Sequence, residues 1–155
     1  MIPGGKGANQ AAAASRLGGS SNDGASRAET LRAAEEAASK MLEWGVQTVI
    51  VTLGQAGAVV ADDEGSVHVP ARRAKIVDTT AAGDTFIGAL FVALNRDTPI
   101  RDAVRCATCA GTLTVTRFGA QPSLPSRGEV DTFYREVVEG LGDSAGGSTG
   151  SLNRG

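Results

Sequence analysis

The segment at residues 46–53 (VQTVIVTL) constrains the fold more than any other part of the chain. It is short, rich in β-branched residues and largely apolar, and it follows a helical pattern and precedes a glycine turn. Such a run predicts a strand that is buried on both faces, which is typical of a parallel sheet covered by helices. The segment therefore predicts an α/β fold.

Helical patterns surround this strand. Two capping-box patterns, Ser26 with Glu29 and Ser126 with Glu129, predict the first turns of two helices. Two short segments that contain β-branched residues flank a turn at 62–65, and this pattern predicts a hairpin over residues 58–69. We predict helices over residues 8–17, 26–44, 85–94, 100–115 and 126–141.

Composition limits the class of protein. The chain has 155 residues, of which 41% are hydrophobic, and a formal net charge of -2. These values favour one folded domain and give no sign of a nucleic-acid partner or of a basic membrane-binding surface. No apolar run reaches the length of a membrane span, and the N-terminus lacks the apolar core of a signal peptide, so we expect a cytoplasmic protein without a membrane partner. We interpret the Gly/Ser-rich residues 19–26 as a linker or deletion junction and residues 142–155 as a disordered tail.

A glycine-rich turn near the N-terminus is the first candidate site. It contains Gly4, Gly5, Lys6 and Gly7, and Asn9 follows. Glycines allow a ligand to approach the backbone, and the Lys and Asn side chains donate hydrogen bonds that suit sugar hydroxyls. The alternative is a flexible N-terminal tag followed by an Ala-rich helix.

The segment DTTAAGD at residues 78–84 is the second candidate. Successive backbone N–H groups in a turn of small residues, placed before a helix, form a site for an anion. Asp84 beside such a site can take a proton from a hydroxyl while the N–H groups hold a transferring phosphoryl group. The alternative is that Asp84 serves only as the N-cap of the helix.

Weaker signals lie elsewhere. The glycine turn at 52–57 follows a strand and can hold a nucleotide against its backbone, but such turns are common. The loop at 117–123 offers oxygen atoms for a monovalent cation, with a plain surface loop as the alternative. Cys106 and Cys109 lie within a helical pattern and are interpreted as core residues, and His68 as a residue on a strand face.

Three segments together resemble the ribokinase-type sugar kinases of the phosphofructokinase-B (pfkB) family, in the order that the family has them. They are GGKGANQAAAASRLG, DTTAAGDTFIGAL and TRFGAQPSLPSRGEV, and the resemblance covers roughly residues 3–141. It implies a ribokinase-like α/β fold with a parallel sheet flanked by helices. Residues 27–141 would be its C-terminal nucleotide-binding half, and residues 1–18 an orphaned sugar-side motif.

The resemblance also implies ATP-dependent phosphorylation of the ribose 5-hydroxyl, with Mg²⁺ and activation by K⁺. Asp84 would be the catalytic base. The anion hole would comprise Ala81, Ala82, Gly83 and Asp84, and the sugar would contact Gly5, Lys6, Asn9 and Asp84. The nucleotide would contact Thr52, Leu53, Gly54, Gln55, Ala56, Gly57, Gly83 and Thr108. The monovalent cation would lie among Asp78, Thr80, Thr114, Arg117, Gly119 and Ser123.

The chain departs from the family in length. Members are considerably longer, and a large stretch is missing between residue 17 and about residue 23, where the family has several strands, an acidic sugar contact and the Asn-Glu motif for Mg²⁺. Three hypotheses follow. The chain phosphorylates ribose or a related sugar, as a monomer or a homo-oligomer; it binds ATP or ADP without transfer; or it is a truncated, non-functional gene product.

Overall fold

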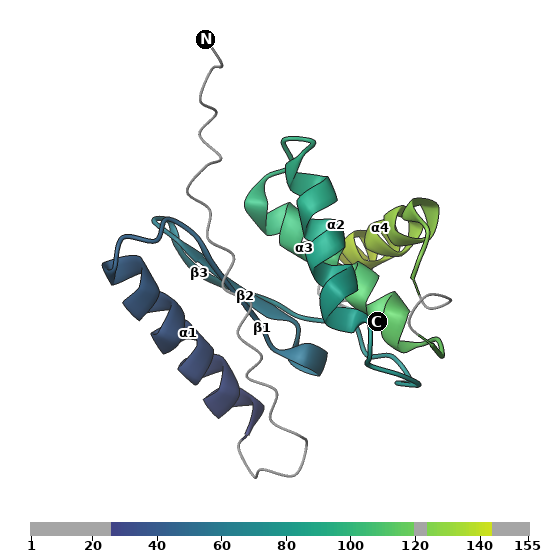
Figure 1. Ribbon diagram of the computed structural model, residues 1–155, viewed down its shortest axis with the longest axis horizontal. Coiled ribbons are helices and arrows are strands. Elements are labelled where there is room, and N and C mark those ends of the chain that lie inside the picture. The colour runs from purple at the N-terminus through teal and green to yellow at the C-terminus, as the bar shows by residue number, and fades with distance from the viewer. Residues whose placement is uncertain (1–25, 120–123, 144–155) are drawn as a thin grey trace, which may run out of the picture.

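The computed structural model describes residues 26–119 and 124–143. A small sheet lies between helix α1 on one face and helices α2 and α3 on the other, and α4 packs against α3 (Figure 1). The helices are α1 (Arg27–Glu43), α2 (Ala82–Leu94), α3 (Ile100–Val115) and α4 (Arg127–Asp143). The strands are β1 (Val49–Thr52), β2 (Ala58–Asp62) and β3 (Gly65–Val69), and the short 3-10 helix η1 (Gly54–Ala56) joins β1 to β2.

The three strands pair in the order β1-β2-β3, and both pairs are antiparallel. Val51 faces Val59 in the first pair, and Val59 faces His68 in the second. The hairpin predicted over 58–69 is confirmed. The parallel pairing expected for residues 46–53 is not present among the described strands. The connection between β1 and β2 through η1 is short, so the chain reverses direction and β2 pairs antiparallel to β1. The apolar run reflects burial on both faces, which an antiparallel strand between two helical layers also has.

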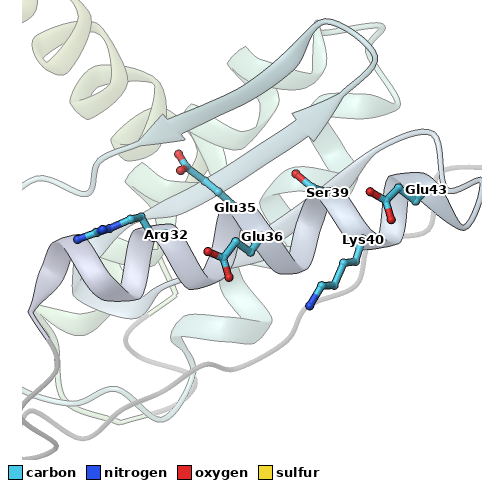
Figure 2. Close-up of a pocket in the computed structure, with 6 residues that line it drawn as sticks. All are labelled: Arg32, Glu35, Glu36, Ser39, Lys40 and Glu43. Atoms are coloured by element: carbon cyan, nitrogen blue, oxygen red, sulfur yellow. The ribbon is translucent and has the colours of Figure 1, made fainter.

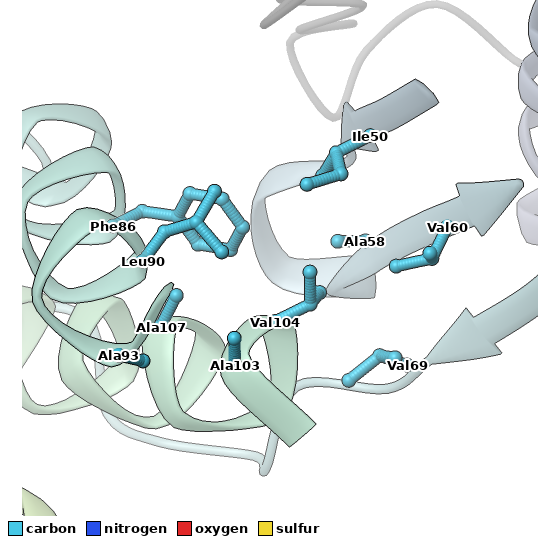
Figure 3. Packing of buried hydrophobic residues seen from close by; sticks show 10 residues of the cluster. All are labelled: Ile50, Ala58, Val60, Val69, Phe86, Leu90, Ala93, Ala103, Val104 and Ala107. Carbon is cyan, nitrogen blue, oxygen red and sulfur yellow. The ribbon is translucent and has the colours of Figure 1, made fainter. Parts of the chain in front are cut away.

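Two clusters of buried side chains hold the layers together. On one face of the sheet, Ile50, Ala58 and Val60 pack against Phe86 and Leu90 of α2 and against α3 (Figure 3). On the other face, the alternate residues of β1 and β2 pack against Ala34 and Ala38 of α1. Because neighbouring strand residues point to opposite faces, Val59 and Val60 are both fully buried, each in a different cluster.

The helix ends follow local chemistry. Both predicted capping boxes are present, since Ser26 and Glu29 exchange side-chain and backbone hydrogen bonds at α1, and Ser126 and Glu129 do so before α4. Helix α2 begins at Ala82, earlier than the predicted residue 85, and α4 extends to Asp143, two residues into the predicted tail.

An ion pair joins the hairpin to the helical layer. Arg101, in the first turn of α3, donates a hydrogen bond to Asp62 at 3.0 Å and lies 3.4 Å from Glu64. The contact attaches the β2–β3 turn to α3. Across residues 26–119 and 124–143, no helix combines the length and apolar character that crossing a membrane requires.

Candidate active site

The first turn of α2 carries the central candidate residue, Asp84. The N-cap of this helix is Ala81, which makes no side-chain capping hydrogen bond, and Asp84 lies within the first turn with an exposed side chain. The interpretation of Asp84 as a simple N-cap is therefore wrong. An acidic side chain here interacts favourably with the helix dipole, and its carboxylate is exposed to solvent.

The backbone around Asp84 offers few free N–H groups. The Ala82 amide donates to the Thr79 carbonyl at 3.3 Å. The amides of Gly83 and Asp84 lie in the first turn, where helix geometry provides no intrahelical acceptor. Of the four residues predicted to form the anion hole, Gly83 and Asp84 are thus the best placed to bind a phosphoryl oxygen.

The glycine turn at 52–57 forms a closed loop at the end of β1. The Leu53 amide donates to the Gly57 carbonyl at 2.7 Å, and the Gly57 amide donates to the Gly54 carbonyl at 3.0 Å. Gly54 has a φ of +56°, and a Cβ at this position would meet no atom within 4 Å. The loop therefore exposes backbone with open space beside it, as a nucleotide contact requires.

Packing connects the strands on either side of this loop with helix α2. Phe86, which follows Asp84 by two residues, lies in one buried cluster with Ile50 of β1 and Ala58 of β2, on either side of the loop (Figure 3). The strands that flank the loop at 52–57 therefore share one buried cluster with the helix that carries Asp84.

The predicted cation loop also assembles from distant segments. Asp78 accepts hydrogen bonds from the Thr80 amide at 2.9 Å, from the Thr80 hydroxyl at 2.6 Å and from the Gly119 amide at 3.1 Å. These bonds, the Thr80 hydroxyl foremost, lower the pKa of Asp78 below its ordinary value. The amides of residues 77 and 78 both donate to the Val115 carbonyl, so the segments that contain Thr80 and Gly119 lie against each other.

Arg117 has a different partner from the one that a cation site needs. Its guanidinium is hydrogen-bonded to Glu129 of α4, and together with Ser126 it lowers the pKa of Glu129 to about 2. The Arg117 side chain is thus paired with an acid, and only the oxygen of its backbone carbonyl suits a cation. Thr114 is buried, and its hydroxyl donates to the Ala110 carbonyl at 2.9 Å. The hydroxyl hydrogen is therefore already used, and a cation would have only the oxygen atoms of Thr114 to bind.

Thr108, the predicted nucleobase contact, is buried in α3. Its hydroxyl donates to the Val104 carbonyl at 2.8 Å, so that the hydroxyl proton is already used within the helix. Gly5, Lys6, Asn9 and Ser123 lie outside the described residues.

The two cysteines fit the prediction of core residues. Both are free thiols, and burial raises the pKa of Cys109 to about 12 and raises that of Cys106 as well. Thiols of this kind are poor nucleophiles. Across residues 26–119 and 124–143, no group of three or more His, Cys, Asp or Glu side chains comes together to hold a metal ion.

Two surface depressions lie away from Asp84. One, of about 440 Å³, follows the outer face of α1 and is lined by Arg32, Glu35, Glu36, Ser39, Lys40 and Glu43 (Figure 2). The other, of about 520 Å³, lies between the end of α3 and α4 and includes Arg117, Glu129 and Phe133. The first has the mixed charges of a solvated helix face, and α1 covers the sheet face opposite α2.

His68 has a role that sequence reasoning missed. Its Nε2 lies 2.7 Å from the carbonyl oxygen of Ala56, in the glycine turn. The available signal was a polar ring between two valines near the end of the hairpin strand, which requires a hydrogen-bond partner once it is partly buried.

Comparison with known proteins gives a consistent result. The model of the pfkB family of carbohydrate kinases matches residues 22–127. The ribokinase of Schizosaccharomyces pombe is 44% identical over 107 residues, which are 68% of this chain and 34% of that protein.

Solved structures agree with the sequence matches. The ribokinase of Thermotoga maritima superposes with a TM-score of 0.62 at 46% identity, over 65% of this chain and 34% of that one. The ribokinase of Arabidopsis thaliana, in complex with ribose and ATP, superposes with a TM-score of 0.60 at 33% identity, over 64% of this chain and 33% of that one. The chain therefore spans about a third of the length of the relatives that it matches.

Proposed function

Because this chain belongs to the pfkB family of carbohydrate kinases, we propose that it supplies the nucleotide-binding and phosphoryl-transfer part of an ATP-dependent kinase for ribose or a closely related sugar. The observation that carries this proposal is the exposed Asp84 in the first turn of α2, next to amides without intrahelical acceptors. The α/β architecture supports it, since Phe86, two residues after Asp84, packs in one cluster with Ile50 and Ala58, which lie on either side of the glycine loop at 52–57.

In this proposal Asp84 takes the proton of the sugar hydroxyl while the hydroxyl oxygen attacks the γ-phosphorus of ATP. The bond from that phosphorus to the β-phosphate oxygen breaks, and ADP leaves with the electron pair. The amides of Gly83 and Asp84 hold the transferring phosphoryl group, and Ala81 and Ala82 shape the turn. Residues 52–57 line the nucleotide, with Thr108 near its base, and Gly5, Lys6 and Asn9 contact the sugar.

The proposed cofactors are assigned by their chemistry. Mg²⁺ would be held mainly through the phosphates of ATP, as this ion usually is. A monovalent cation such as K⁺ prefers oxygen ligands, and the Asp78 carboxylate lies beside the Thr80 hydroxyl and the backbone of Gly119. Backbone oxygens of Thr114 and Arg117 and the Ser123 hydroxyl complete the proposed set.

A second function, nucleotide binding without transfer, is favoured by one observation. The chain matches only about a third of the length of its relatives, and under this second proposal most of the sugar contacts lie in the part that has no counterpart here. A sugar that is poorly oriented loses much of the acceleration that proximity provides.

The deciding experiment measures ribose-dependent release of ADP from ATP with Mg²⁺ and K⁺, together with ADP binding by calorimetry. For an active chain, we expect Asp84→Asn to reduce turnover by about 10² to 10⁴-fold while ADP binding stays unchanged. Asp131→Asn, on the exposed face of α4, is the matched control. Full activity in Asp84→Asn would exclude this residue as the base.

The remaining outcomes separate the other hypotheses. ADP binding without turnover in the wild-type chain supports the second function, and neither binding nor turnover contradicts both. Repeating the assay across protein concentrations tests the homo-oligomer hypothesis, because an active oligomer gains specific activity with concentration.

A further inference from the structure

A single hydrogen bond links the end of β3 to the glycine turn. His68 Nε2 lies 2.7 Å from the Ala56 carbonyl oxygen, across twelve positions of sequence. A carbonyl oxygen only accepts, so Nε2 carries the hydrogen and donates it. His68 pairs with Val59 across the hairpin and therefore lies on the α1 side of the sheet, the side on which Ala56 also packs.

A second contact holds the next residue of the same turn. A Cβ on Gly57 would lie 2.0 Å from the Val69 carbonyl oxygen and 2.6 Å from the Ala71 amide nitrogen. The backbone of Gly57 is thus pressed against the residues that directly follow His68. The two consecutive residues that close the turn, Ala56 and Gly57, are both held by the end of β3.

The turn needs such support. η1 comprises only the three residues Gly54–Ala56, and 3-10 segments of this length have poor internal hydrogen-bond geometry. The hydrogen bond from His68 fixes the Ala56 carbonyl. The contact at Gly57 limits movement of the turn toward the end of β3.

We propose that His68 is a positioning residue for nucleotide binding: its Nε2–H holds the Ala56 carbonyl, so that the turn presents its backbone in one conformation. The inference rests on the proposed function, in which residues 52–57 line the nucleotide. His68 acts through the turn and does not itself contact the ligand. A loop that is ordered before binding costs less conformational entropy when the ligand arrives.

The test uses the full chain and ADP with Mg²⁺ as the probe. His68→Leu keeps an apolar side chain of similar size without a donor, and His68→Gln keeps an N–H donor at a similar reach. Ser66→Ala, an exposed position on the same strand, is the matched control. Calorimetry gives the Kd for ADP, and amide hydrogen exchange without nucleotide reports the order of Ala56 and Gly57.

We expect His68→Leu to weaken ADP binding about two- to tenfold, the loss that one net hydrogen bond predicts, and to speed exchange at both amides. His68→Gln should restore both values, and Ser66→Ala should change neither. If His68→Leu does not fold cooperatively, His68→Glu, which lacks a donor at neutral pH, replaces it in the comparison with His68→Gln.

Two results would overturn the inference in different ways. Wild-type Kd and exchange in the donor-free variant would refute the role of His68 and leave the proposed function intact. No ADP binding by the wild-type chain would refute the nucleotide site itself, and the inference with it.

Discussion

Replacement of Gly57 by alanine tests how tightly the glycine turn is packed against the hairpin. Gly57 has φ +96° and ψ −129°, a combination that residues with a side chain rarely adopt. An added Cβ would also lie 2.0 Å from the Val69 carbonyl oxygen and 2.6 Å from the Ala71 nitrogen. Both neighbours are backbone atoms, so no side-chain rotation relieves the overlap.

The expected cost has two parts. Holding alanine in this backbone region costs about 1–3 kcal/mol. Moving the residues that follow β3 away from the new methyl group costs about 1–3 kcal/mol more, by analogy with overpacked cores. The sum, about 2–6 kcal/mol, is a large share of the about 5–15 kcal/mol that stabilises a typical domain.

Gly54→Ala is the matched control in the same turn. Gly54 also has a positive φ, +56°, but a Cβ there meets nothing within 4 Å. Its cost should be limited to the about 1–2 kcal/mol of a left-handed alanine. Urea unfolding followed by circular dichroism gives both free energies of unfolding. Equal unfolding midpoints for the two variants would refute the close contact between Gly57 and the end of β3.

Three further predictions concern helices α3 and α4. The Arg117 hydrogen bond is the main cause that lowers the pKa of Glu129 to about 2, so its contribution to stability is present above the ordinary pKa of 4.5 and is lost as pH falls toward 2. The midpoint of thermal unfolding should fall as the pH is lowered from 4.5 to 2, and it should fall less steeply in Glu129→Gln than in the wild-type chain. Parallel plots of midpoint against pH for the two proteins would contradict this prediction. Cys109, with a pKa of about 12, should react with a thiol-specific disulfide reagent far more slowly than the less buried Cys106. Unfolding in urea should remove this difference in rate. Equal rates in the folded chain would contradict the burial of Cys109. Val104→Ala, at a fully buried position, should lower the free energy of unfolding by about 2 kcal/mol in urea titrations, and an unchanged midpoint would contradict its place in the core.

Predictions that depend on local chemistry are confirmed. The capping boxes of Ser26 and Ser126 involve residues three positions apart, and the hairpin turn at 62–65 joins neighbouring segments. Interactions over such short distances are encoded almost entirely by the residues themselves. The start of α2 was harder to predict, because Ala81 has no capping side chain that marks it.

The strand direction of β1 shows where local reasoning stops. Its apolar run predicts burial on both faces, and Val49 and Val51 are indeed buried against α1. Burial depends on the layers above and below a strand, whereas direction depends on the neighbour with which it pairs. A pattern of hydrophobicity contains the first kind of information and not the second.

By itself, the sequence determined the α/β class, most of the secondary structure and the family, because propensities, caps and signature segments are properties of short stretches. Only the tertiary structure placed Asp78 against Gly119, 41 residues away, His68 against Ala56, and Phe86 in one cluster with Ile50. These contacts join segments that are separated along the chain. They form only when the layers pack, since side-chain burial and register then decide which distant residues meet.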